Sequence, residues 1–125
     1  MKKRIFYHDT DCGGVVYYAN YLKYLEEART LFLEERGIKI ADAVEKGLWF
    51  VVKRQEIDYR APAFYGDELE INTSLKEMTP YRLIFACDTF SQKKILLNKS
   101  ITELVCVDRN LKTCEIPQWI SEKLK

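Results

Sequence analysis

The sequence predicts an α+β fold in which one long helix packs against a largely antiparallel sheet. Apolar residues recur at helical spacing over residues 20–36. From about residue 50 onward the apolar pattern changes to a period of two, which is typical of strands. The strand-like stretches then follow one another with only turns between them, and such sequential strands pair antiparallel.

Residues 4–8 predict a short first strand, and residues 11–14 predict a turn that leads into the helix. The apolar stripe of this helix consists of Tyr21, Leu25, Ala28 and Phe32, widened by Leu22 and Leu33. We expect Asn20 to cap its N-terminus. Gly37 stands where a left-handed C-terminal cap belongs. The spacing of Glu26 and Arg29 predicts an i, i+3 ion pair on the helix surface.

Residues 38–47 predict a loop with a short helical piece. The four later strands are expected over residues 50–59, 68–76, 82–90 and 95–107. Turns with proline or glycine separate the first three of them, at 61–67 and 79–80. Together with the first strand this gives a sheet of five strands beside one long helix.

Length and composition predict one domain over residues 1–125. The chain has 125 residues, of which 47% are hydrophobic, enough for a substantial core and too few for a second domain. The 20 basic and 19 acidic side chains give a formal net charge of +1. A charge this small predicts neither nucleic acid nor an anionic membrane as a partner.

The cysteines show no C-x-x-C spacing, and with a single histidine they predict no metal site and no cofactor. These residues are Cys12, Cys87, Cys106, Cys114 and His8. The basic start of the chain is not followed by an apolar signal region, and no apolar run approaches the roughly 20 residues of a membrane span. We therefore expect a cytoplasmic protein with reduced thiols and no insertion into a membrane.

Two strand segments are apolar almost without interruption, at residues 83–87 and 104–107. Such runs indicate that both faces of the sheet are covered at these positions. One helix covers only one face. Further copies of the chain are therefore expected to cover the other.

A carboxylate stands at a glycine-containing turn in the segment between residues 9 and 21. Gly13 and Gly14 allow a sharp turn and close approach of a ligand to the backbone. The helix that follows begins with unpaired N–H groups at its positive end, which suit an anionic oxygen. Asp11 beside such donors is the combination that hydrolysis of an ester or thioester needs.

The chain resembles the 4-hydroxybenzoyl-CoA thioesterase family of hotdog-fold enzymes, and within it the acyl-CoA thioesterases associated with the Tol-Pal system. The matching residues run through almost the whole chain in order. They are Arg4-Ile5, Thr10-Asp11, Gly14-Val15-Val16, Tyr21-Leu22, Glu26, Arg29, Phe50-Val51-Val52, Asp58-Tyr59, Ala61-Pro62 and Val105-Cys106-Val107-Asp108.

This resemblance implies a hotdog fold, in which an antiparallel sheet wraps a long central helix, and a homotetramer built from dimers with active sites between subunits. It implies a thioester of CoA or acyl-carrier protein as substrate. The catalytic carboxylate of the family falls on Asp11, and its oxyanion-binding backbone N–H falls on Tyr18. Gly14 would shape the turn and Tyr17 would contact the acyl group. The subfamily often has histidine where this chain has Tyr18. A backbone donor does not depend on the side chain, so the oxyanion role is kept, whereas a role of the imidazole itself is not carried over to this chain.

Several alternatives remain open for the residues of this segment. Asp11 acts either as a nucleophile or as a general base, and it also suits a purely turn-forming role. Asp9 fits a local turn hydrogen bond better than a catalytic role. Cys12 with His8 as its base would give a thiolate mechanism, but a small buried thiol is the expected state of Cys12.

Two other functions compete with thioester hydrolysis. One is an acyl-binding carrier or scaffold of the same fold, without hydrolysis. The other is a dehydratase, for which His8 would be the only available histidine. Lys53, Arg54 and Arg82 are candidates to hold the phosphates of CoA, and they are equally suited to a solvated strand edge.

Overall fold

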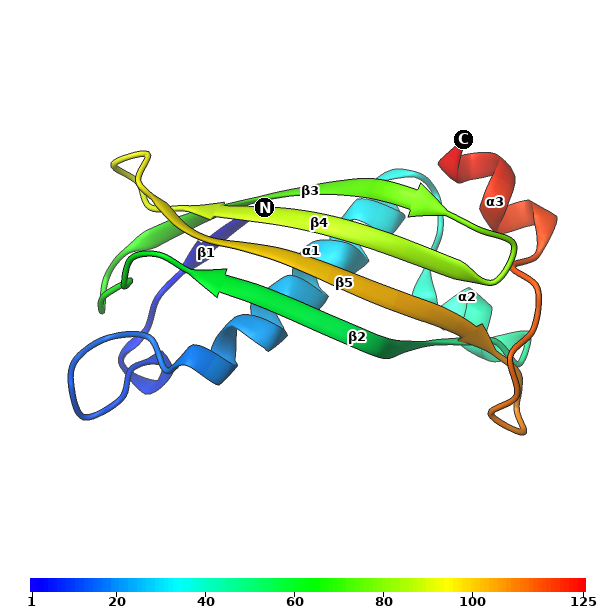
Figure 1. Cartoon of the computed structure of the whole chain (residues 1–125), viewed down its shortest axis with the longest axis horizontal. Coiled ribbons are helices and arrows are strands. Elements are labelled where there is room, and N and C mark those ends of the chain that lie inside the picture. The colour runs from blue at the N-terminus through cyan, green and yellow to red at the C-terminus, as the bar shows by residue number, and fades with distance from the viewer.

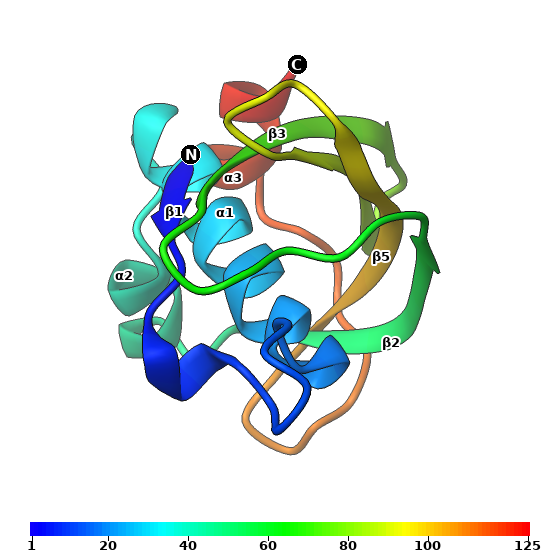
Figure 2. The same cartoon turned by 90° about the vertical axis from the view of Figure 1, so that its left-hand side faces the viewer.

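The computed structural model covers residues 1–125 and contains a curved five-stranded sheet wrapped around one long helix (Figure 1). Every neighbouring pair of strands is antiparallel, in the order β1-β3-β4-β5-β2. The elements are β1 (Lys2–Arg4), α1 (Tyr21–Glu35), α2 (Ile40–Glu45), β2 (Trp49–Tyr59), β3 (Glu68–Met78), β4 (Arg82–Phe90), β5 (Leu96–Val107) and α3 (Gln118–Leu124). Seen end-on, α1 lies in the hollow of the sheet (Figure 2).

The long helix buries the predicted stripe against the concave face of the sheet. Tyr21, Leu25, Ala28 and Phe32 are all buried. The helix ends in a Schellman motif, because Gly37 donates to the Glu34 carbonyl and Ile38 to the Leu33 carbonyl, both at 2.9 Å. Gly37 has a φ of +77°, which glycine adopts without strain.

Leu22, which was expected to widen the stripe, is exposed, whereas Leu33 is buried as predicted. Tyr24 is buried in the core instead. The curved sheet therefore meets α1 on the side of Tyr24 and not on the side of Leu22. This direction depends on how the sheet wraps the helix, so the spacing of apolar residues alone did not give it.

The first strand is shorter than the sequence predicts. Strand β1 ends at Arg4, and residues Tyr7–Asp9 form a 3₁₀ turn. The cause is local: the backbone N–H of Phe6 donates to the Asp9 carboxylate at 2.8 Å. The Asp9 side chain thus competes with the sheet for this backbone group.

A C-terminal helix that the sequence did not predict closes one end of the core. Helix α3 begins after Pro117 and places Ile120 fully inside a cluster with Phe85 and Leu83. A buried isoleucine of this kind contributes about 2–5 kcal/mol to stability relative to alanine. None of the helices combines the length and the apolar character that a membrane span requires.

The side chains on the two faces of strand β4 are buried to different extents. Leu83, Phe85 and Cys87 are buried on the concave face, and the Phe85 ring lies 5.4 Å from that of Phe32 on α1. Ile84 and Ala86 alternate with them and are only half-buried. One helix thus covers one face, as the sequence implies. The cover of the other face by further copies of the chain stays a prediction.

Candidate active site

The glycine-containing segment folds into a tight hairpin at the start of α1. Thr10 and Val16 pair as an antiparallel bridge, and the N–H of Asp11 donates to the Val15 carbonyl at 2.9 Å. Gly14 closes the turn by donating to the Asp11 carbonyl at 3.1 Å. The φ of Gly14 is +81°, so a residue with a side chain would be strained at this position.

The carboxylate of Asp11 stands at the exposed tip of this hairpin. Its Oδ1 accepts the N–H of Gly13 at 2.8 Å, which fixes the orientation of the side chain. Its Oδ2 makes no hydrogen bond within the chain and faces no ion-pair partner. The turn-forming role and the catalytic role are thus compatible, because the turn uses one oxygen and leaves the other free.

Two backbone N–H groups before α1 lack an acceptor within the chain. Tyr17 donates to the Asp9 carbonyl at 3.0 Å, and Asn20 donates to the Tyr17 carbonyl at 2.9 Å. The N–H groups of Tyr18 and Ala19, which lie between them, make no intramolecular hydrogen bond. They belong to the 3₁₀ turn Tyr18–Asn20, which runs directly into the positive end of α1. Such donors can stabilise an oxyanion.

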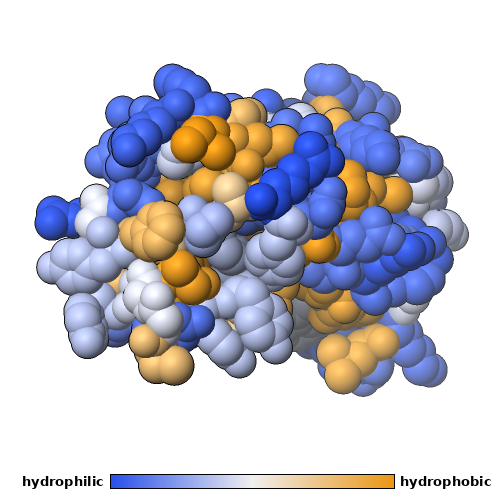
Figure 3. Space-filling model, turned by 60° about the vertical axis from the view of Figure 1, so that its left-hand side comes forward, coloured by the Kyte–Doolittle hydropathy of each residue, from blue (hydrophilic) through white to orange (hydrophobic).

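A hollow of about 330 Å³ opens beside these donors, between the start of α1 and the end of β2. Its lining residues are Val16, Tyr18, Tyr21, Tyr59, Arg60, Ala61 and Pro62. Tyr17 is not among them; its ring lies 4.9 Å from that of Tyr18, outside the hollow. The space-filling view of this end of the molecule shows apolar side chains exposed in several separate patches (Figure 3).

Tyr59 is a residue of the hollow whose part the sequence analysis missed. Its hydroxyl donates to the Tyr18 carbonyl at 2.8 Å. Burial, with the neighbouring Tyr18 hydroxyl adding to it, raises the pKa of Tyr59, so the donor keeps its proton at neutral pH. The sequence marked Tyr59 only as part of the Asp58-Tyr59 motif of the family, and this motif does not predict a hydrogen bond to Tyr18.

Asp9 and Asn20 hold the hairpin against the start of α1. Asp9 is buried and accepts the Phe6 N–H, so the predicted local turn bond is confirmed. Burial alone would raise the pKa of Asp9. The hydrogen bond from the Phe6 N–H, together with the nearby Tyr24 hydroxyl and His8 side chain, outweighs burial and holds this pKa below its ordinary value.

The prediction that Asn20 caps α1 is wrong. Its side chain makes no cap hydrogen bond, and its Nδ2 donates to the Asp9 carbonyl at 2.8 Å. The residue occupies the position just before the helix but already has helical backbone angles. Its amide therefore points back to the hairpin instead of to the first turn of α1.

The alternative thiolate mechanism finds little support in the geometry. Cys12 is exposed, so the expected burial of its thiol is wrong. His8 is exposed as well, and its Nδ1 lies 4.0 Å from the Asp9 carboxylate with no hydrogen bond to Cys12. The proposed base therefore makes no contact that would activate the Cys12 thiol. No three His, Cys, Asp or Glu side chains come together as metal ligands.

The candidate phosphate-binding residues differ in their surroundings. Arg54 is paired with Glu56, and Arg82 donates to Glu103 at 2.6 Å. Lys53 forms no ion pair and lines a hollow of about 580 Å³ with Arg82 on the convex face of the sheet. Lys53 is therefore the one of these three side chains whose charge has no acidic partner.

Comparison with known proteins decides the family. The profile of the thioesterase-like superfamily matches residues 7–124. The acyl-CoA thioester hydrolase YbgC of Escherichia coli (O6:H1, strain CFT073) is 35% identical over 123 residues, which are 98% of this chain and 92% of that protein. The chain belongs to the thioesterase-like superfamily. The prediction of a hydrolase is thereby confirmed.

Solved structures of similar proteins agree with the fold. A hypothetical protein of Aquifex aeolicus superposes with a TM-score of 0.94 at 31% identity, covering 100% of this chain and 98% of the other. A gentisyl-coenzyme A thioesterase superposes with a TM-score of 0.90 at 26% identity, covering 97% and 98%. The predicted hotdog fold is confirmed. The narrower assignment to the 4-hydroxybenzoyl-CoA and Tol-Pal branches stays a prediction.

Proposed function

We propose that this chain, as a single domain, is an acyl-CoA thioesterase that hydrolyses the thioester bond to a free acid and CoA. The observation that carries the proposal is the pair of free N–H groups at Tyr18 and Ala19, on the same hairpin-helix unit as Asp11. A carbonyl oxygen placed on these donors would have its developing negative charge stabilised in the transition state. The names of the relatives, acyl-CoA thioester hydrolase and gentisyl-coenzyme A thioesterase, point to the same substrate class.

In the proposed mechanism the thioester carbonyl accepts a hydrogen bond from the Tyr18 N–H. Asp11 then acts in one of two ways. As a nucleophile, its Oδ2 attacks the carbonyl carbon, the carbon–sulfur bond breaks, CoA leaves as a thiolate, and water hydrolyses the mixed anhydride. As a general base, Asp11 takes a proton from the water that attacks directly.

Oxygen-18 distinguishes these two roles of Asp11. The enzyme is mixed with a limiting amount of acyl-CoA in labelled water, so that each molecule turns over once. Label found in the Asp11 carboxylate by peptide mass spectrometry supports the anhydride. Label found only in the product acid is expected for the general base and also for an anhydride that water opens at its acyl carbon, so hydroxylamine is then added to trap any anhydride as an Asp11 hydroxamate.

The activity itself is tested by release of thiol from acyl-CoAs of stepped chain length and from aromatic acyl-CoAs. Hydrolysis of one class well above the others supports the proposal and identifies the acyl group. Binding of acyl-CoA without any release of thiol would support the alternative, a non-hydrolytic acyl-thioester-binding or scaffold protein. An acyl-carrier-protein thioester is included as a substrate, because both thioesters present the same phosphopantetheine arm.

The working form is proposed to be a homotetramer built from dimers. The half-covered convex face at Ile84 and Ala86, and the position of β2 at the edge of the sheet, support such an assembly. The four free thiols are compatible with the expected cytoplasmic location.

A further inference from the structure

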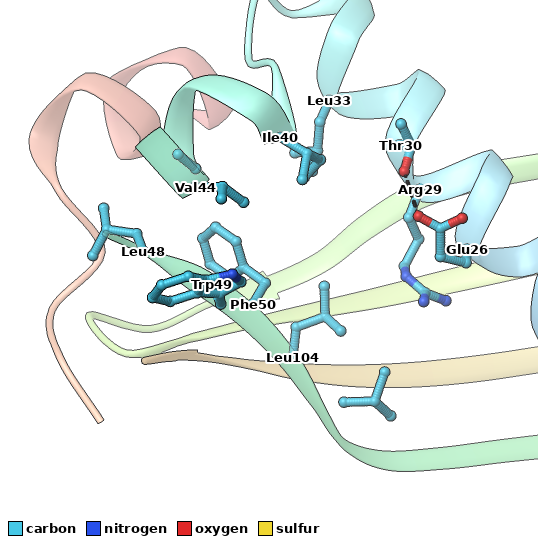
Figure 4. A pocket seen from close by; sticks show the side chains of 12 residues that line it. Glu26, Arg29, Thr30, Leu33, Ile40, Val44, Leu48, Trp49, Phe50 and Leu104 are labelled. Atoms are coloured by element: carbon cyan, nitrogen blue, oxygen red, sulfur yellow. Dashed lines mark hydrogen bonds between the residues drawn. The ribbon is translucent and has the colours of Figure 1, made fainter. Parts of the chain in front are cut away.

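A buried arginine lines a second pocket, away from the Asp11 hairpin. This pocket of about 190 Å³ lies between α1, α2 and the first residues of β2 (Figure 4). Its walls are mostly apolar, with Leu33, Phe50 and Leu104 among them. Arg29 is only 7% exposed, and its guanidinium points from α1 toward the sheet at the side of this pocket (Figure 4).

The charge of Arg29 has no partner within the chain. Its Nη1 makes one long hydrogen bond of 3.3 Å, to the Thr102 hydroxyl. That hydroxyl is itself engaged, because it donates to Gln55 at 2.8 Å. No carboxylate lies within ion-pair distance of Arg29. Burial lowers its pKa, and the opposing electrostatic effects of Cys87 and Glu26 do not offset it.

The expected pairing of Arg29 with Glu26 is therefore wrong. The Glu26 carboxylate instead accepts the Thr30 hydroxyl at 2.8 Å, at the exposed rim of the pocket. A guanidinium carries five N–H donors in a planar fork that matches a carboxylate. Buried charges in proteins are as a rule paired, since leaving one unpaired is costly. The unfilled donors of Arg29 thus indicate a missing acceptor.

The pocket and the proposed site of chemistry share no lining residue, but they border the same two elements. The hollow beside Tyr18 lies where α1 begins and β2 ends, at Tyr59. The Arg29 pocket borders the same two elements further along, where β2 begins at Phe50. Both hollows thus lie along one interface, between α1 and β2. At 1.5 Å per residue, Arg29 stands roughly 12 Å along the helix from Tyr21.

On the basis of the proposed thioesterase function, we propose that this pocket receives the far end of the acyl group and that Arg29 binds an oxygen acceptor there. The substrates favoured by this arrangement are acyl-CoAs whose chain ends in a carboxylate or, more weakly, a hydroxyl. The apolar walls contact the methylene or ring portion, and the arginine fork replaces the water that a terminal carboxylate gives up. A chain ending in a methyl group would leave the guanidinium without an acceptor.

The test compares acyl-CoAs of equal length that differ only in a terminal methyl, hydroxyl or carboxyl group. For wild type we expect kcat/KM to favour the carboxyl end over the methyl end by roughly 10- to 100-fold, the range for hydrogen bonds to a charged group. Arg29→Met should abolish or invert this preference, because methionine fills the space without donors. Arg29→Lys, which keeps the charge but not the fork, should give an intermediate preference.

Lys23→Met is the matched control, since it removes a cation from the exposed face of the same helix. Its preference should equal that of wild type. Equal or greater activity of wild type toward the methyl-ended series at every length would overturn the inference, whether or not the Arg29 variants fold. That result, together with dissociation of the oligomer in Arg29→Met, would assign the missing acceptor to a second copy of the chain.

Binding separates a failure of this inference from a failure of the proposed function. Non-hydrolysable thioether analogues with the same three ends are titrated by calorimetry. If no acyl-CoA is hydrolysed but the carboxyl-ended analogue still binds most tightly and loses its advantage in Arg29→Met, the pocket assignment stands and the thioesterase proposal falls. If thiol is released but neither assay detects an end preference, the thioesterase proposal stands and the pocket assignment falls.

Discussion

The hydroxyl of Tyr59 donates a 2.8 Å hydrogen bond to the carbonyl oxygen of Tyr18, across 41 residues of sequence. The contact ties the last residue of β2 to the turn that begins α1. The Tyr59 ring also packs against the rings of Tyr18 and Tyr21, with centroids 6.4 and 5.8 Å apart. The Tyr18 carbonyl belongs to the peptide unit whose N–H is that of Ala19. The orientation of the free Ala19 N–H, next to that of Tyr18, therefore depends on a side chain from the sheet.

Replacing Tyr59 with phenylalanine should lower kcat on acyl-CoA by roughly 2- to 10-fold, the range expected for the loss of one hydrogen bond. The ring contacts remain, so KM and the melting temperature should change little. Steady-state kinetics of thiol release measures the effect. Tyr65→Phe is the control, because this exposed tyrosine makes no hydroxyl hydrogen bond. An unchanged kcat in Tyr59→Phe would mean that the hydrogen bond does not position the donors.

The parts of the fold that were predictable from the sequence are those set by local pattern. The stripe of α1 and its cap at Gly37 follow from spacing, and β4 begins and ends at the expected residues. Helix α3 was missed because its seven residues are too few to show a helical period. It exists because Ile120 is buried in the core, a tertiary contact with no local signature.

The candidate site was predictable to a similar extent. The turn at Asp11 and the presence of free N–H groups before α1 agree with what the glycines and the helix start indicated, whereas the choice of Tyr18 among those groups came from the resemblance. Tyr59 was missed because a hydrogen bond between distant segments depends on the three-dimensional fold. Glu26 and Arg29 were expected to pair from spacing alone, but the curved sheet draws Arg29 inward and leaves Glu26 at the surface.

Cys12→Ala should retain most of the activity, because the proposed mechanism uses the Asp11 carboxylate and His8 makes no hydrogen bond to this thiol. A loss of several orders of magnitude with intact folding would instead favour the thiolate mechanism. Melting temperature and circular dichroism serve as the folding control.

The cysteines of this chain are expected to react with an alkylating agent at different rates. Iodoacetamide at neutral pH should label exposed Cys12 well before Cys87 and Cys106. Burial raises the pKa of the Cys87 thiol and raises that of Cys106 to about 12, with Cys114 adding to the effect at Cys106. Peptide mass spectrometry gives the order of labelling. Equal rates at all three positions would contradict the burial on which the order rests.

Low pH is expected to destabilise the protein at the hairpin, because it protonates the Asp9 carboxylate. The folded-state pKa of this carboxyl lies below its ordinary value of 3.8, so its ionised form contributes stability above that pH. The contribution is lost as the pH falls through the lower folded-state pKa. Asp9→Asn should therefore be less stable than wild type at neutral pH, with the difference shrinking in acid. Urea unfolding at stepped pH measures this difference, and one that stays constant down to pH 2 would contradict the assignment.

Purified protein should be oligomeric at micromolar concentration, because one helix leaves the convex face at Ile84 and Ala86 half-covered. Light scattering with size-exclusion chromatography measures the mass. Ile84→Glu should shift the distribution toward smaller species, whereas a charge at the exposed Leu111 should not. A wild-type protein that elutes as a compact monomer would remove the basis for a site shared between subunits.

Asp11→Asn should abolish turnover while leaving the oligomer and binding of acyl-CoA nearly unchanged. Asparagine keeps the acceptor oxygen that holds the Gly13 N–H, so the turn has no reason to fail. It is neither an effective base nor a carboxylate nucleophile. Loss of a general base alone costs about 10²–10⁴-fold, and loss of a covalent route costs more. The decrease should appear in kcat, since the proposed mechanism places this carboxylate at the reacting carbonyl and not at the CoA portion.

Asp108→Asn is the matched control for Asp11→Asn. Asp108 also accepts backbone N–H groups in a turn, those of Asn110 at 2.8 Å and Lys112 at 3.1 Å. Its replacement tests whether exchange of a turn-forming aspartate for asparagine is tolerated, and its kcat should equal that of wild type. If Asp11→Asn kept near-wild-type kcat on an acyl-CoA that the parent hydrolyses, the turn would be the only function of Asp11. The attacking water would then have to be activated by another group.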